Sequence, residues 1–144
     1  MKNPYAILRI CLTVTIATLT TAPIGSQAFA DDVLLSENVP LVVQIHADWC
    51  RTCKTLEPTW TQIRGEFGDQ SRILKLDVSD REAYEASLEK AKLFEIEAFF
   101  LKHRQKTGTI AVFDCTTREP VALLRGELGI NKYRKAIALA WASC

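Results

Sequence analysis

The sequence lacks an excess of charge of either sign, an internal repeat and a proline- or glycine-rich linker. Its 144 residues carry 18 Lys and Arg against 17 Asp and Glu, and these charges alternate along the chain to give a formal net charge of +1. The absence of a basic stripe argues against a nucleic-acid-binding surface, and the absence of an acidic tail means that charge indicates no partner. We therefore expect one monomeric globular domain of ordinary composition.

The first thirty residues differ from the remainder of the chain. Lys2 and Arg9 provide a positively charged start, residues 10–24 form an uncharged apolar and threonine-rich run, and Ala28-Phe29-Ala30 resembles a cleavage site. The run is shorter than the ~20 apolar residues that span a bilayer. We expect residues 1–30 to be a cleavable signal peptide and residues 31–144 to be the mature domain, without a membrane anchor, in the periplasm or another extracytoplasmic (lumenal) compartment.

The mature region alternates strand and helix patterns. Short β-branched runs predict four strands, and apolar residues at steps of three and four predict three helices, the last of them capped by Asn131 with Tyr133, Ile137 and Trp141 facing inward. This order predicts an α/β domain with a mixed sheet of four to five strands, helices on both faces, and a parallel first pair of strands. The predicted strands are 41–47, 73–78, 109–113 and 121–124, and the predicted helices are 51–67, 81–102 and the one that follows residue 131.

Cys50 and Cys53 lie where the first predicted strand passes into a helix. The Cys50 sulfur should face the unpaired amides and the positive dipole end of that helix, which favour the nucleophilic thiolate. Cys53 lies one turn later and is able to resolve a mixed disulfide formed at Cys50. Arg51 and Lys54 add positive charge, so we expect them to lower the Cys50 pKa further.

Two structural interpretations of the pair are weaker. A disulfide across two intervening residues closes too small a loop to constrain much of the unfolded chain. A zinc site usually needs a second cysteine pair of this spacing, whereas Cys115 and Cys144 stand alone. We therefore expect redox chemistry at this pair and no bound metal.

Residues 43–54, with Pro58 five positions after the second cysteine, resemble the active-site region of the thioredoxin family. The resemblance extends over about residues 38–142 and implies the thioredoxin-like fold. It also implies roles for particular residues: Cys50 attacks, Cys53 resolves, Trp49 flanks the pair, Lys75 matches a lysine that lies under the active site, and Gly126 matches the glycine that ends the last strand.

The chain departs from the family pattern at two positions near the cysteines. Gln44 stands where the family has a buried carboxylate, and His46, on the same strand face, is a candidate to carry the resolving proton in its place. Aligning residues 109–113 with the family's fourth strand places Gly108 at the position of the family's cis-proline, and no proline lies between Pro58 and Pro120. We expect either a different backbone turn at Gly108 or a dithiol that is more open to metal.

Two further features lie outside the motif. The connection from Asp77 to Gly108 is long, and its apolar patch 99–101 is expected to belong to the core. Cys115 and Cys144 are expected to form a structural disulfide away from the active site, closing a loop of about 30 residues that contributes about 3 kcal/mol.

The leading functional interpretation is an enzyme that exchanges disulfides with protein thiols outside the cytoplasm, without a cofactor and with a separate redox donor or acceptor. Its direction is not indicated by the sequence. One alternative is a metal-binding module, such as a copper carrier, that uses Cys50 and Cys53 with His46 or His103. Another is an adaptor that binds partners through residues 99–101 without turnover.

Overall fold

The computed structural model describes residues 38–144, so the predicted signal peptide lies outside the described residues. The described chain alternates strands and helices as the hydrophobic pattern predicts, which confirms the α/β class. The elements are β1 (Leu41–His46), α2 (Arg51–Phe67), β2 (Arg72–Asp77), α3 (Arg81–Leu93), α4 (Glu97–His103), β3 (Thr109–Phe113), β4 (Pro120–Arg125) and α5 (Ile130–Trp141).

These strands form one mixed four-stranded sheet in the order β2-β1-β3-β4. β1 pairs in parallel with β2, from Leu41 opposite Arg72 to His46 opposite Asp77. β3 runs antiparallel to both β1 and β4, which confirms the predicted hairpin. Every residue of β1 is buried, as expected of a central strand that is covered on both faces.

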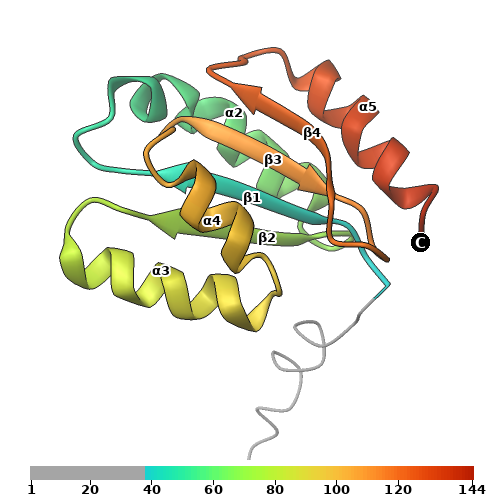
Figure 1. Cartoon of the computed structure of the whole chain (residues 1–144). Helices are drawn as coiled ribbons and strands as arrows, with labels where there is room; N and C mark the ends of the chain where they lie inside the picture. Colours follow the sequence, from blue (N-terminus) through green and yellow to red (C-terminus); the bar gives the residue numbers. More distant parts are fainter. Residues whose placement is uncertain (1–37) are drawn as a thin grey trace, which may run out of the picture.

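Helices cover both faces of the sheet (Figure 1). α3 and α4 pack on one face, where Val43, Ile45 and Phe100 belong to one buried cluster. α2 and α5 pack on the other face, where Trp60 and Tyr133 are almost completely buried. Among residues 38–144, none of the helices has the length and apolarity needed to cross a membrane.

The prediction of one helix from Arg81 to Lys102 is wrong, because the chain forms two helices there. α3 ends in a Schellman motif: the amide of Ile96 donates to the Ala91 carbonyl at 2.8 Å, and the amide of Glu95 donates to the Lys92 carbonyl at 3.0 Å. Glu95 takes the left-handed conformation with φ 59°, a position usually held by glycine. The break turns Ile96 into the core beside Ala91, so burial outweighs the backbone cost.

The last helix also differs in detail from its prediction. Its N-cap is Gly129, and Asn131 instead accepts a hydrogen bond from Arg134 at 2.8 Å. Tyr133 and Ile137 face inward as predicted, but Trp141 is 38% exposed, and the small residues Ala136 and Ala140 complete the buried face.

The apolar patch 99–101 lies in α4. Phe100 is fully buried, and Phe99 packs edge-on against Phe113 with ring centroids 4.8 Å apart. Only Leu101 is substantially exposed. This confirms the expectation that most of the patch belongs to the core.

Candidate active site

Cys50 is the N-cap residue of α2. Its extended backbone, with φ −80° and ψ 111°, turns the side chain over the first turn, where its sulfur accepts a hydrogen bond from the Cys53 amide at 3.1 Å. No acidic residue lies in this first turn. An amide donor and the positive end of the helix dipole therefore both face the Cys50 sulfur, and both stabilise a thiolate relative to a thiol.

The two cysteines are bonded in the structure, with Cα atoms 5.3 Å apart. They differ in burial: Cys50 retains 6% exposure, whereas Cys53 is completely buried. Because attack on a disulfide requires access to a sulfur, the geometry makes Cys50 the sulfur that an external thiol reaches.

The two residues before Cys50 are tied to the segment that follows β2. The Asp48 amide donates to the Ser79 hydroxyl at 2.8 Å, and the Trp49 indole N–H donates to the Ser79 carbonyl at 3.1 Å. Trp49 nevertheless remains 63% exposed. Its ring is therefore anchored to the segment after β2 while most of its surface is exposed.

Gly108 forms the turn before β3, and no peptide bond among residues 38–144 is cis. Its φ of +77° favours glycine, and its amide donates to the Ile45 carbonyl at 2.9 Å. A Cβ at this position would lie 2.6 Å from Thr52 Cγ2. Of the two outcomes expected at Gly108, the structure shows a different backbone turn, with the Thr52 side chain packed against it.

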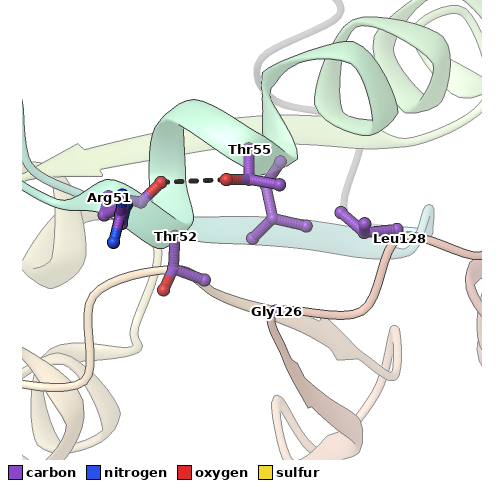
Figure 2. Close-up of a pocket in the computed structure, with 6 residues that line it drawn as sticks. Arg51, Thr52, Thr55, Gly126 and Leu128 are labelled. Carbon is purple, nitrogen blue, oxygen red and sulfur yellow. Dashed lines mark hydrogen bonds between the residues drawn. The ribbon is translucent and has the colours of Figure 1, made fainter.

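A shallow groove lies along the start of α2, where it is lined by the two residues between the cysteines (Figure 2). Thr52 points from the first turn of α2 toward the loop that carries Gly126, and Leu128 lies across from Thr55. The groove has a volume of about 200 Å³ and is lined by Arg51, Thr52, Thr55, Leu56, Gly126 and Leu128. The groove is thus lined by both apolar and polar groups, which come from the start of α2 and from the loop that follows β4.

The predicted supporting residues fall into different environments. Gln44 is completely buried, and neither atom of its amide has a hydrogen-bond partner in the described part of the chain. Arg51 and Lys54 are exposed on the first turn of α2. Lys75 lies opposite Gln44 in the sheet register, but its side chain is exposed. The role that the resemblance implies for Lys75 therefore stays a prediction.

The two histidines lie in separate places. His46 is 7% exposed, and its Nε2 lies 3.2 Å from Asp48 Oδ1. His103 stacks on Phe99, with ring centroids 4.6 Å apart. Burial, together with the nearby Lys106 and Lys102, lowers the pKa of His103.

Sequence reasoning missed Asp77 and Ser79, which are linked to the residues before Cys50: Ser79 accepts a hydrogen bond from the Asp48 amide and donates to Asp77. Burial of Asp77 would raise its pKa, but hydrogen bonds from the Ser79 hydroxyl and amide, together with the charges of His46 and Lys75, outweigh burial and hold the pKa below its ordinary value. The signal was available in the strand pattern, because parallel pairing of β1 with β2 places Asp77 beside His46.

The other two cysteines of the described region meet at the opposite end of the central strands. Cys115 follows β3 and is paired with Cys144, with Cα atoms 5.2 Å apart. Hydrogen bonds support the contact: the Cys115 amide donates to the Ser143 hydroxyl at 3.4 Å, and the Thr116 hydroxyl donates to the Ser143 carbonyl at 2.8 Å. The C-terminus therefore lies against the β3–β4 turn (Figure 1).

Comparison with known proteins agrees with this geometry. The thioredoxin family model matches residues 20–117. A thioredoxin of Mycolicibacterium smegmatis is 38% identical over 58 residues, which are 40% of this chain and 51% of that protein. A putative protein disulfide-isomerase of Schizosaccharomyces pombe is 32% identical over 54 residues, 36% of this chain and 11% of that protein. The aligned regions thus span about half or less of these two relatives.

Among solved structures, a thioredoxin-like protein in its oxidised form superposes with a TM-score of 0.50 at 18% identity, covering 73% of this chain and 79% of that one. This likeness supports the thioredoxin-like fold. Because the family model covers more than half of the sequence and includes the cysteine pair, the chain belongs to the thioredoxin family.

Proposed function

We propose that this protein is a thiol-disulfide oxidoreductase that acts on protein thiols and disulfides, with Cys50 as the attacking and Cys53 as the resolving cysteine. The observation that carries the proposal is the placement of the Cys50 sulfur at the N-cap of α2, where the Cys53 amide donates to it at 3.1 Å. Membership of the thioredoxin family supports it.

In the reductive direction, the Cys50 thiolate attacks one sulfur of a substrate disulfide. The substrate S–S bond breaks, one substrate sulfur leaves as a thiolate, and a mixed disulfide forms at Cys50. The Cys53 thiolate then attacks the Cys50 sulfur and releases the second substrate thiolate. The protein keeps the disulfide, the substrate has gained two electrons, and a separate redox donor must reduce the pair before the next turnover.

The groove beside the disulfide suits a polypeptide substrate. Leu128 is 52% exposed and Trp49 is 63% exposed. Leu128 lines the groove together with the polar side chains of Arg51, Thr52 and Thr55. Such a mixed surface can hold an extended segment while its sulfur approaches Cys50.

Insulin reduction and refolding of a scrambled disulfide protein test the activity. Wild-type protein should catalyse exchange in at least one assay, Cys50→Ser should abolish it, and Cys53→Ser should accumulate the mixed disulfide. The double variant Cys115→Ser with Cys144→Ser is the matched control, since it removes the disulfide at the other end of the sheet without freeing a thiol and should leave exchange unchanged. Exchange that persists in Cys50→Ser would contradict the assignment.

A Cu(I) titration of the reduced protein, done in parallel, addresses the copper-binding alternative. Thiolates suit this soft ion. Tight stoichiometric binding that needs Cys50 and Cys53, in a protein without exchange activity, would replace the oxidoreductase proposal with a copper-binding module.

We also propose that the protein acts outside the cytoplasm. Support comes from the charged start at Lys2 and Arg9, the apolar run 10–24 and the small residues Ala28 and Ala30. Expression of the full chain in a bacterium, followed by fractionation and intact mass measurement, should yield a periplasmic product that begins at Asp31. A product that keeps Met1 and stays in the cytoplasm would contradict export.

A further inference from the structure

A compact group of potential metal ligands lies beside the disulfide but does not include it. His46, Asp48 and Asp77 each offer one ligand atom, and these three atoms all lie within 4.8 Å of one another. The residues come from the end of β1, the turn before Cys50 and the end of β2, so the parallel strand pair brings them together. Neither the dithiol chemistry nor the core packing requires this combination.

We propose that His46, Asp48 and Asp77 form a binding site for a divalent transition-metal ion such as Zn²⁺, independent of Cys50 and Cys53. One imidazole nitrogen and two carboxylates form a borderline-to-hard donor set that zinc accepts, whereas Cu(I) prefers thiolates.

The distances fit such an ion with little rearrangement. Zinc bonds of about 2.0–2.1 Å in tetrahedral geometry separate neighbouring ligand atoms by about 3.3 Å. His46 Nε2 and Asp48 Oδ1 are already 3.2 Å apart. The remaining ligand needs to approach by no more than about 1.5 Å, and the exposed side chain of Asp48, at 84%, is free to adjust.

The charge of the group also favours a cation. Two of its three members are carboxylates, which are ligands suited to a divalent cation. Within residues 38–144, no lysine or arginine forms an ion pair with Asp48 or Asp77. Ser79 donates two hydrogen bonds to a single oxygen of Asp77, which fixes that carboxylate and leaves its second oxygen for a ligand.

Burial distinguishes this group from a cluster of surface acids. His46 is more than nine-tenths buried, and its Nδ1 has no hydrogen-bond partner in the described region. Nε2 lies 3.2 Å from Asp48 Oδ1, so this nitrogen is the one that is directed toward the cluster. A metal ion bound to Nε2 would link β1, the turn before Cys50 and β2.

The test uses the full chain in its oxidised form with Cys11 replaced by serine, because cysteines bonded in disulfides do not bind metal and Cys11 lies outside the two pairs. Co²⁺ is titrated with visible absorption as the readout, and Zn²⁺ binding is measured by calorimetry. We expect one saturable site per chain and a Co²⁺ spectrum with d–d bands but without the intense charge-transfer band of thiolate ligation.

Asp77→Asn and His46→Gln should each weaken binding about tenfold or more. Asp69→Asn and His103→Gln are the matched controls, since each makes the same chemical change outside the cluster, and they should bind as wild type does. If His46→Gln fails to fold, as judged by circular dichroism, the exposed Asp48→Asn together with Asp77→Asn decides the question.

Absence of saturable binding below about 1 mM, or equal affinity in wild type and Asp77→Asn, would overturn the proposal. The proposal would also be overturned if His103→Gln lost binding while His46→Gln and Asp77→Asn bound as wild type does. The result is separate from the proposed exchange activity, because it is measured with Cys50 and Cys53 already oxidised.

Discussion

Thr52 and Gly108 are in direct contact across the active site. The methyl group of Thr52, in the first turn of α2, occupies the space into which a side chain at position 108 would project, since a Cβ there would lie 2.6 Å from Thr52 Cγ2 and 2.8 Å from Thr52 Cβ. Thr52, one of the two residues between the cysteines, therefore packs against the turn before β3 and leaves no room there for a side chain.

Gly108→Ala should destabilise the protein by about 2–4 kcal/mol, because it adds both a left-handed backbone penalty and a steric clash. Urea unfolding measures the change. A double-mutant cycle with Thr52→Ala should recover part of the loss, because it removes the closest atom.

Gly65→Ala is the control for this prediction. Gly65 lies inside α2 with open space around its Cα, so the same added methyl should stabilise the protein by about 0.5–1 kcal/mol. Strict additivity of Gly108→Ala and Thr52→Ala would contradict the proposed contact.

The reduced protein should contain an unusually reactive Cys50. In a Cys53→Ser variant, the alkylation rate of Cys50 should rise with a midpoint below pH ~8.5, the value of an unperturbed thiol, because the helix start favours the thiolate. Arg51→Gln should move this midpoint upward, whereas Lys135→Gln, an equivalent charge change on α5, should not. A midpoint at or above the ordinary value would remove the electrostatic basis of the proposed mechanism.

His103 should make stability depend on pH in the weakly acidic range. Burial, Lys106 and Lys102 lower its pKa in the folded protein. The unfolded chain therefore binds a proton near pH 6.5 while the folded chain does not, so stability is complete above pH 6.5 and falls as the pH drops toward the lowered folded pKa.

For one titrating group, the free energy of unfolding falls by at most about 1.4 kcal/mol per pH unit. Urea unfolding at pH 7.5 and pH 5.5 measures it, and the difference between the two values should shrink in His103→Gln. An unchanged difference in that variant would assign the acid sensitivity to other groups.

The pair Cys115–Cys144 should contribute to stability and not to exchange. The bond closes a loop with a sequence separation of 29, so its removal in Cys115→Ser should lower the free energy of unfolding by about 3–4 kcal/mol. Mass spectrometry of the unreduced protein should detect no free thiol at either position. Two alkylatable thiols in protein purified from an oxidising compartment would contradict the pairing.

Most of the fold follows from patterns that are local in the sequence. The β-branched run at 41–46 and the apolar spacing of Leu56, Trp60 and Ile63 predict β1 and α2, because each pattern specifies which face is buried. The break at Glu95 was not predictable in this way. Nothing in Phe94-Glu95-Ile96 stops a helix locally, and the Schellman turn forms there because it places Ile96 in the core.

The same distinction between local and tertiary information applies to the candidate site. The reactive pair was predictable from the sequence, because the spacing of Cys50 and Cys53 and their place after a strand are local properties. The contacts around the pair, Thr52 against Gly108 and Asp77 beside His46, became visible only in the folded structure. Residues far apart in the chain make these contacts, and their distances depend on strand register and helix packing rather than on the identity of neighbouring residues.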